Sequence, residues 1–351
     1  MINKTGKYCF THTSGGAIFL FNLQNATGSE VLITNYGAII TSIKIKQTDG
    51  TVNDIVLGFD KPEEYVAEDY LRDYPWFGCA VGRHANRIKN AEFELNGKKY
   101  HLTKNSRYDQ LHGGDGGFDR RVWEFAGQGT TPQPWLSLTY KSPDSEEGFP
   151  GNLVVTIRFE WSDENELSYE YTATCDEPTV VNLTHHDYFN LNNGTGTIED
   201  HEIKIYASRM LEQDENLVAT GSLTPVTNTV YDFREFTRLG DRLTKIEDTI
   251  AIGYDKSFVV DNIGTQLVAE ARSSQSGLTL QVYTTEPIVH FYSGKWIPVV
   301  KGKNGTTYGP LSGFCLETHG YPNAVNIPGF PTTILKPGET YRHKTVYKII
   351  S

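Results

Sequence analysis

Two adjacent histidines, His185 and His186, lie in a strand-like run at residues 180–191, VVNLTHHDYFNL. Side chains of a β-strand alternate between two faces, so the two imidazoles are expected to point apart and not to share a metal ion. One face then carries Val180, Asn182, Thr184, His186, Tyr188 and Asn190. A row of uncharged hydrogen-bonding groups suits a polyhydroxylated ligand, which favours His186 for chemistry. The competing interpretation is that both histidines are structural.

A second candidate for acid/base chemistry is Glu317, in the otherwise apolar run FCLET at residues 314–318. Alternation places Glu317 on one face with Cys315 and His319. Burial there would raise the pKa of the carboxyl toward the range of a useful general base. The alternative is a glutamate at a strand end that reaches water.

Polar side chains suited to ligand binding occur in further segments. Residues 78–93 crowd arginine and asparagine beside glycines, and the forked guanidinium of arginine suits bidentate hydrogen bonding. Residues 110–121 place four glycines around a histidine, as in a loop whose backbone closely approaches a ligand. Surface arginines and glycine turns are common, so each signal is weak by itself. The candidates from these and two later segments are Arg83, His84, Asn86, Arg87, His112, Asp255 and His290.

The elements that must position these residues are predicted to be strands. Asn96-Gly97 splits residues 91–103 into two alternating runs, which predicts a type I′ hairpin. Helical periodicity is confined to 61–70 and 241–250, too short for the crossovers of a parallel sheet. Further strands are expected at 31–45, 152–161, 166–175, 178–191, 201–207, 256–261, 265–272, 277–284, 288–293, 312–318 and 340–350. We expect an all-β fold, a large antiparallel β-sandwich with a few short helices, as a single domain over residues 1–351.

Composition excludes several classes of protein. A net charge of −11 is spread along the chain, so no basic patch is available for nucleic acid. No apolar stretch approaches the roughly 20 residues of a membrane helix, and the N-terminal residues lack a signal-peptide core, so a cytoplasmic protein is expected. The four cysteines show no C-x-x-C pairing, which argues against a zinc knuckle and a disulfide framework. No G-x-S-x-G or H-E-x-x-H hydrolase motif occurs.

Six ordered blocks resemble the aldose 1-epimerase (galactose mutarotase) family across almost the whole chain. They are VGRHANRIKNAEFELNGKKYHL, QLHGG, VVNLTHHDYFNL, GYDKSFVV, EPIVHFYSGK and FCLETHGYPNAVN. The resemblance implies a single large antiparallel β-sandwich. It also implies interconversion of the α and β anomers of free aldoses such as galactose and glucose, without a cofactor or metal.

The same resemblance implies roles for individual residues. His186 would be the acid that protonates the ring oxygen, and Glu317 the base that removes the proton from the C1 hydroxyl. Each positioned proton transfer contributes about 10²- to 10⁴-fold. The residues expected to bind the sugar are Asn86, Arg87, His112, Tyr188, Asp255 and His290.

Four positions depart from the family pattern. His185 stands where Asn is usual, Lys256 where His is usual, and His290 and His319 where Gln is usual. A ring at His290 cannot offer the donor and acceptor geometry of a primary amide. His319 would lower the pKa of Glu317 if protonated, and would mainly orient it if neutral.

Two other functions use the same residues. One is a non-catalytic sugar-binding or regulatory protein on the same scaffold, which retention of His186 and Glu317 argues against. The other is a glycosidase, which would need two carboxylates such as Asp255 and Glu317 at a defined separation. A monosaccharide substrate and a monomer or weak homodimer are expected.

Overall fold

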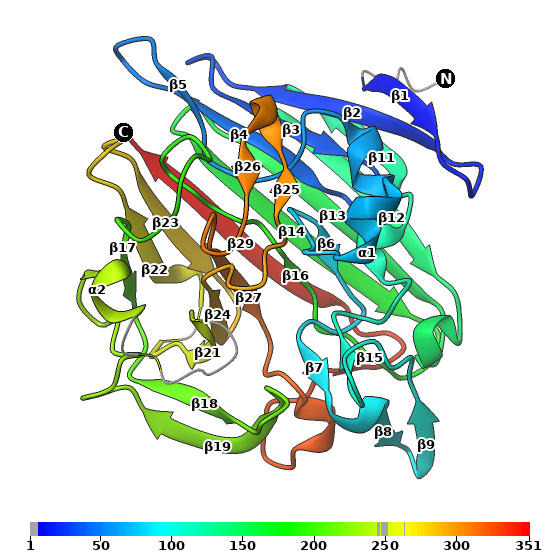
Figure 1. Cartoon of the computed structure of the whole chain (residues 1–351). Coiled ribbons are helices and arrows are strands. Elements are labelled where there is room, and N and C mark those ends of the chain that lie inside the picture. The colour runs from blue at the N-terminus through cyan, green and yellow to red at the C-terminus, as the bar shows by residue number, and fades with distance from the viewer. Residues whose placement is uncertain (1–5, 244–245, 247–251, 263) are drawn as a thin grey trace.

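A nine-stranded antiparallel sheet forms one broad layer of the protein. The structure, a computed structural model, describes residues 6–243, 246, 252–262 and 264–351. The red strand β29 crosses the middle of this sheet between β14 and β23 (Figure 1). In spatial order the strands are β11 (Glu124–Gly129), β12 (Trp135–Ser142), β13 (Leu153–Trp161), β14 (Glu166–Cys175), β29 (Tyr341–Ile350), β23 (Thr279–Thr284), β22 (Gln266–Arg272), β17 (Glu202–Ile205) and β20 (Thr237–Arg238).

Two five-stranded antiparallel sheets pack on this layer. The N-terminal one is β1 (Lys7–Thr11), β2 (Ala17–Gln24), β3 (Glu30–Thr34), β4 (Ile40–Lys46) and β5 (Val52–Asp54). The other has the order β19 (Ala219–Pro225), β18 (Arg209–Gln213), β21 (Asp255–Val259), β24 (Ile288–Tyr292) and β27 (Cys315–His319).

Smaller elements connect the large sheets. The strand pairs are β6 (Ala80–Val81) with β16 (Thr184–His185), β7 (Arg87–Ile88) with β10 (Gln110–Leu111), β8 (Glu92–Leu95) with β9 (Lys98–His101), β15 (Thr179–Val180) with β28 (Ile334–Leu335), and β25 (Val300–Lys301) with β26 (Thr307–Tyr308). The helices are α1 (Glu68–Arg72) and α2 (Gly240–Leu243), with 3₁₀ turns η1 (Pro62–Val66), η2 (Lys89–Ala91), η3 (Phe118–Arg120), η4 (Glu146–Gly148), η5 (Lys303–Gly305) and η6 (Ala324–Asn326). Across the described ranges, every helix is too short or too polar to span a bilayer.

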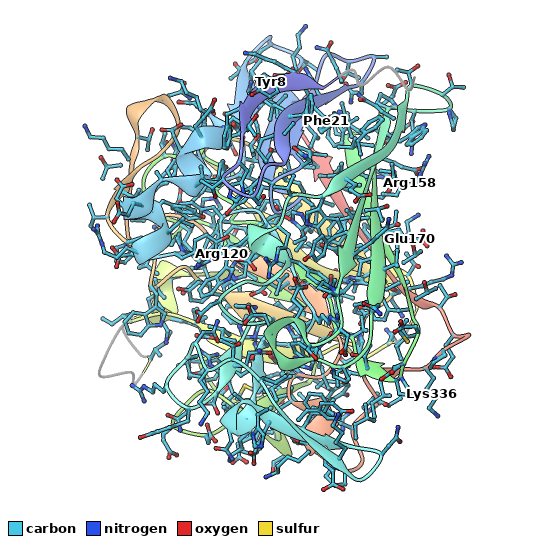
Figure 2. All side chains as sticks on the ribbon, turned by 90° about the vertical axis from the view of Figure 1, so that its right-hand side faces the viewer. Tyr8, Phe21, Arg120, Arg158, Glu170 and Lys336 are labelled. Atoms are coloured by element: carbon cyan, nitrogen blue, oxygen red, sulfur yellow. The ribbon has the colours of Figure 1, made fainter. Side chains whose placement is uncertain are left out.

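The main apolar core lies where the sheets face one another. Along β13, buried and partly exposed residues alternate, as a strand with one covered face requires. Arg158 and Glu170 lie opposite each other on β13 and β14 and point outwards (Figure 2). Phe21 of β2, Phe159 of β13 and Phe291 of β24 belong to one buried cluster, so all three sheets share a core. The prediction of an antiparallel β-sandwich is confirmed.

Local turn chemistry also agrees with the sequence. Asn96 and Gly97 both have positive φ angles, 54° and 73°, between β8 and β9, which is the type I′ geometry expected of Asn-Gly. The predicted helix at 61–70 consists of η1 and α1. The predicted helix at 241–250 begins with α2, and most of its remaining residues lie outside the described part of the chain.

The prediction of one continuous strand over residues 178–191 is wrong. Only β15 and β16 are strands, because the segment passes through the interior and every side chain from 179 to 192 is buried. Polar groups there must bond to protein. Asn182 Oδ1 accepts a hydrogen bond from the backbone of Gly320 (2.7 Å), and Asn190 Nδ2 donates to the carbonyl of Ser312 (2.8 Å). These two residues are therefore structural, although they belong to the predicted polar row.

Arg83 is structural as well. Its guanidinium is buried and donates to the backbone oxygens of Ser142 (3.0 Å), Pro143 (2.8 Å) and Pro150 (2.9 Å). It also donates to the Ser142 hydroxyl at 2.7 Å. This side chain fixes the segment that carries Asn86 to the connection between β12 and β13.

We predict that Arg83→Met lowers the free energy of unfolding by about 3 kcal/mol, because several buried carbonyl oxygens lose their donor. Urea denaturation measures the change. Arg342→Met is the matched control, since Arg342 pairs with Glu170 at 3.1 Å on the exposed side of the sheet. The control substitution should lower the free energy of unfolding by less than about 1 kcal/mol. Equal losses in the two variants would contradict a structural role for Arg83.

Candidate active site

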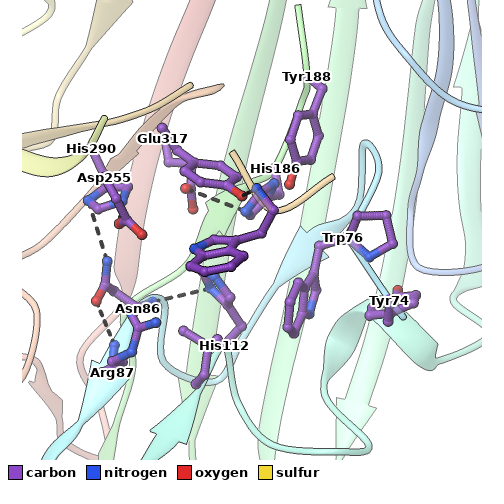
Figure 3. A pocket seen from close by; sticks show the side chains of 14 residues that line it. Tyr74, Trp76, Asn86, Arg87, His112, His186, Tyr188, Asp255, His290 and Glu317 are labelled. Atoms are coloured by element: carbon purple, nitrogen blue, oxygen red, sulfur yellow. Dashed lines mark hydrogen bonds and ion pairs between the residues drawn. The ribbon is translucent and has the colours of Figure 1, made fainter. Parts of the chain in front are cut away.

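A cavity of about 210 Å³ gathers the residues that the sequence singled out (Figure 3). All eight predicted catalytic and binding residues line it: Asn86, Arg87, His112, His186, Tyr188, Asp255, His290 and Glu317. They come from six separate parts of the chain. Arg83 and His84, which the sequence also flagged, are not among the lining residues.

Three neighbouring strands supply one wall of the cavity. His290 on β24 pairs with Ser257 on β21 and with Glu317 on β27, and Tyr292 pairs with Asp255. Directly opposed residues of antiparallel strands share a face. The register therefore points Asp255, His290 and Glu317 to the same side.

His186 reaches the cavity from a different part of the chain, just after β16. Its backbone N–H donates to Cys79 (2.9 Å), and its carbonyl accepts from Gly78 (2.9 Å). The ring Nε2 lies 3.5 Å from Glu317 Oε1. The other nitrogen, Nδ1, lies 3.5 Å from the sulfur of Cys315. Two chain segments far apart in sequence thus bring an imidazole and a carboxyl together.

Burial shifts the pKa values of this pair in opposite directions. Loss of water raises the pKa of Glu317 well above its usual value, and the nearby charge of Asp255 adds to the rise. Burial lowers the pKa of His186 to about 3. Glu317 is thus a stronger base when ionised, and His186 a stronger acid when protonated, than either group in water. Among the described residues, Glu317 Oε2 has no hydrogen-bond partner, which leaves it free to meet a ligand.

Cys315 helps to decide which nitrogen of His186 carries the proton. Burial raises the pKa of its thiol, so the sulfur keeps its hydrogen and can donate it to Nδ1. The proton of the neutral ring then lies on Nε2, the nitrogen nearest Glu317. This arrangement suits proton exchange at Nε2.

The loops that carry Asn86 and His112 hold an uncommon backbone geometry. Both residues have positive φ angles, 60° and 52°, and so does Trp76, at 58°. Non-glycine residues in this region are sparse and concentrate at functional sites. Gly113 follows His112 with φ of 89°, and a Cβ there would lie 1.9 Å from the carbonyl oxygen of Gly82. Only glycine allows the two loops to pack this closely.

His112 is placed as a hydrogen-bond donor. The backbone N–H of Asn86 donates to His112 Nδ1 at 3.3 Å, so the neutral ring carries its proton on the other nitrogen. Burial, with His186 and Arg87 nearby, lowers the pKa of His112 well below 6.5 and keeps it neutral. Within the described residues, ligand-type atoms of His112, His186 and Glu317 lie within 4.8 Å of one another. That spacing could hold a metal ion, but a protonated nitrogen is not a metal ligand. A reaction without metal stays a prediction.

Asp255 is held by the ring of His290. His290 Nε2 lies 3.0 Å from Asp255 Oδ1, and His290 Nδ1 lies 2.8 Å from the Ser257 hydroxyl. Burial raises the pKa of Asp255, but the hydrogen bond and charge of His290 outweigh it and lower the value to about 2. Asp255 is therefore ionised. With both ring nitrogens engaged, His290 contacts protein rather than standing free for a ligand.

Aromatic residues complete the cavity, and most were missed from the sequence. Tyr74, Trp76, Tyr292 and Trp296 all line it. The ring centroid of Trp76 lies 5.1 Å from that of His112. Of the aromatic lining residues, Tyr188 was predicted to bind the sugar. The available signal was aromatic residues next to proline or glycine in the loops DYPWFG and YSGKWIP, since aromatic rings in loops often bind ligands.

Comparison with known proteins identifies the family of this chain. The profile of the Aldose 1-epimerase family matches residues 20–348. The chain belongs to the aldose 1-epimerase family. It is 40% identical to the galactose mutarotase of Mus musculus over 96% of this chain and 95% of that protein. It is 33% identical to the aldose 1-epimerase of Escherichia coli over 95% of each. The solved structure of an aldose epimerase homologue from C. elegans superposes with a TM-score of 0.87 at 30% identity, covering 94% of this chain and 98% of that one.

Three of the departures from the aldose 1-epimerase pattern lie outside the cavity lining. His185 is buried between Asp187 (3.0 Å) and the carbonyl of Ala38 (3.1 Å), so it is a structural residue. Lys256 points to the other face of β21 and donates to Gln213 at 2.7 Å. His319 shares the face of Glu317, as predicted. Burial lowers its pKa to about 3, so it is neutral and leaves the charge at Glu317 unchanged.

We predict that His290→Leu raises the pKa of Asp255 from about 2, because burial then acts without the opposing hydrogen bond. Carbon-detected NMR titration of the carboxyl measures the value. A carboxyl whose folded pKa is depressed stabilises the fold above its unfolded pKa near 3.9 and loses that effect as pH falls toward 2. In His290→Leu, the part of the folding stability that depends on the depressed pKa of Asp255 should be absent, so it cannot be lost as the pH falls. Ser257→Ala keeps the His290–Asp255 bond, so Asp255 should stay near 2 in that control. An unchanged pKa in His290→Leu would refute the assignment.

Proposed function

We propose that this chain interconverts the α and β anomers of free aldoses by acid/base ring opening, with Glu317 as the base and His186 as the acid. One observation carries the assignment of roles. His186 Nε2 and Glu317 Oε1 lie 3.5 Å apart, and both buried side chains line the cavity of about 210 Å³. Family membership supports the reaction, since the relatives are named as galactose mutarotase and aldose 1-epimerase.

The chemistry needs one proton removed and one added. Glu317 takes the proton of the C1 hydroxyl while the bond between C1 and the ring oxygen breaks. Protonated His186 donates to the ring oxygen, which becomes the C5 hydroxyl. The open-chain aldehyde rotates about C1–C2, and the reverse transfers close the ring from either face. Each transfer by a positioned group contributes about 10²- to 10⁴-fold.

The pair can reuse one proton through many turnovers. Ring opening moves a proton from His186 to the sugar and another from the sugar to Glu317, so the total held by the pair is constant. Glu317 and His186 interact too closely to titrate independently, and their apparent pKa values belong to the pair. The competent form carries a single proton between the two groups. Hydrogen bonds from sugar hydroxyls to Glu317 favour the form in which that proton lies on His186.

The remaining residues bind the sugar. Ionised Asp255 accepts hydrogen bonds from hydroxyls, and His112 and Asn86 donate them. Arg87 adds a fork of donors, and Tyr188 a hydroxyl. Trp76 and Tyr292 present rings that can cover an apolar sugar face. Galactose and glucose are the substrates to test first, because the relatives' names point to galactose.

Two further properties belong to this proposal. The four cysteines, Cys9, Cys79, Cys175 and Cys315, are free in the structure, which supports a reducing compartment such as the cytoplasm. We also propose a monomer or weak homodimer, which size-exclusion chromatography with light scattering tests.

We predict that Glu317→Gln and His186→Asn each slow mutarotation of freshly dissolved α-D-galactose and α-D-glucose by at least about 10²-fold. Glu317→Gln keeps size and polarity, His186→Asn keeps a polar side chain, and both changes remove the ionisable group. Polarimetry follows the optical rotation, and thermal melting confirms that the variants fold.

Matched controls make the same changes on exposed side chains. Glu94→Gln and His101→Asn, on β8 and β9, should leave the rate unchanged. If the intact protein does not hasten the optical change of any free aldose, the assignment is wrong. Release of sugar from a glycoside would replace it with the glycosidase alternative.

We predict a bell-shaped pH profile of kcat/KM. At low pH both groups of the pair are protonated and the base is lost, and at high pH both are deprotonated and the acid is lost. Stopped-flow polarimetry from pH 4 to 10 measures the profile. His186→Asn should remove the fall at high pH from its residual activity. A profile unchanged in that variant would exclude His186 as the acid.

A further inference from the structure

Asp119 is a buried carboxyl that the proposed mechanism does not use. It belongs to the 3₁₀ turn η3, is 1% exposed, and is not among the residues that line the sugar cavity. The turn is fixed against residues 36–38. The backbone N–H of Gly37 donates to the carbonyl of Arg121 at 2.7 Å, and a Cβ on Gly37 would clash with the carbonyl oxygen of Asp119. Asp119 is therefore held at a defined place in the fold.

Arg120 connects this carboxyl to the sugar cavity. Arg120 Nε lies 3.7 Å from Asp119 Oδ2. The same guanidinium lies over the ring of Tyr74, with its central carbon 4.4 Å from the ring centroid. A cation is attracted to an aromatic face, and a carboxylate beside the cation restricts where it can lie. Because Tyr74 lines the cavity, these contacts run from the buried carboxyl to the cavity surface.

Tyr74 in turn packs on Trp76. Their ring centroids lie 5.3 Å apart in an edge-to-face arrangement (Figure 3). Trp76 also lines the cavity, and its Nε1 is buried without an acceptor among the described residues, so it can donate to a sugar hydroxyl. Its φ of 58° is unfavourable for a large side chain and persists only where neighbouring contacts impose it. The contact of Tyr74 with Arg120 is part of what holds Trp76 in place.

The charge of Asp119 changes near neutral pH. Burial raises the pKa of its carboxyl to about 7, although the charge of Arg120 and the phenol of Tyr74 oppose the rise. The other groups that face it in the described part of the chain keep one charge state there. The phenols and the thiol stay neutral because burial raises their pKa values, and the guanidinium groups stay cationic. These groups are Tyr36, Tyr70, Tyr74, Cys79, Arg120 and Arg121.

We propose that Asp119 is a positioning residue for the sugar cavity. Its carboxylate holds Arg120 over Tyr74, and the wall formed by Tyr74 and Trp76 binds the sugar more tightly while that charge is present. This inference rests on the proposed function, which supplies the ligand and the reaction by which binding is measured.

The test compares Asp119→Asn with the wild type at two pH values, because the amide keeps the shape of the side chain and removes its charge. At pH 8 the variant should have a KM for galactose three- to tenfold higher, with kcat changed less than twofold. At pH 5.5 the wild-type carboxyl is neutral as well, so the two KM values should agree. Stopped-flow polarimetry measures both, and the KM ratio cancels the titration of His186 and Glu317, which both proteins share. An unchanged KM at pH 8, or a ratio that does not vary with pH, would overturn the proposal.

A control and a melting experiment separate positioning from a purely structural role. Asp115→Asn, on an exposed aspartate of the same loop, should leave kcat and KM unchanged at both pH values. The folded pKa of Asp119 lies above the unfolded value near 3.9, so its ionisation costs stability as the pH rises. Asp119→Asn should therefore melt no lower than the wild type at pH 8. A lower melting temperature with an equal loss of kcat at both pH values would overturn the positioning role.

Arg120→Met tests the link to Tyr74 separately. At pH 8 this variant should raise the KM for galactose by a factor similar to that of Asp119→Asn. The double variant should show no further rise, because the carboxylate then has no cation to hold. Effects that multiply in the double variant would contradict the proposed chain of contacts.

Calorimetric binding of galactose to Glu317→Gln distinguishes the two possible failures. If no aldose is turned over, but adding Asp119→Asn weakens galactose binding at pH 8 and not at pH 5.5, the positioning role stands and the proposed function falls. If galactose is turned over and Asp119→Asn leaves its KM unchanged at pH 8, the function stands and the positioning role falls.

Discussion

The register of β24 between β21 and β27 is the constraint on which the site depends. His290 lies opposite Ser257 on one side and Glu317 on the other, so three strands present their functional groups at one level. Alternate residues of β24, Val289 and Phe291, belong to the main apolar core. A slip by one residue would exchange the two faces and bury the polar groups in the core. Core packing and site geometry are thus specified by the same pairing.

Burial is the second requirement, because it shifts the pKa values of Glu317 and His186, the proposed catalytic pair. In water a carboxyl near 4.3 and an imidazole near 6.5 would ionise oppositely and hold each other as a salt bridge. Burial acts against both charges and makes that ion pair unfavourable. In the proposed reaction, the proton then moves between the two groups through the bound sugar. His290 provides the contrast, because its hydrogen bond keeps the neighbouring Asp255 ionised, although burial raises the pKa of that carboxyl too.

The sequence predicted those parts of the fold and the site that depend on neighbouring residues, and it missed those that depend on contacts between distant segments. Alternation in β13 and β14 and the Asn96-Gly97 turn are local, so fold class and hairpin were predictable. β11 and β19 contain glycines and were missed. Residues 178–191 were wrongly predicted as one strand. Both faces of this segment are buried, so the alternation of polar and apolar residues does not separate a solvent-facing side from a core-facing side. Family resemblance supplied the residue roles, whereas the contribution of Trp76 and Trp296 depends on how distant loops meet.

The position of His290 shows why a residue type alone does not define a binding role. A ring in place of the usual glutamine removes an amide that could donate and accept at once. In the structure the ring of His290 has two protein partners, Asp255 and Ser257. It therefore influences a ligand indirectly, by setting the charge and position of Asp255. Because the ring holds Asp255 ionised, the cavity keeps a negative charge beside Arg87. Arg87 and Asp255 both line the cavity and present opposite charges to it, so a hydroxyl can accept a hydrogen bond from Arg87 and donate one to Asp255.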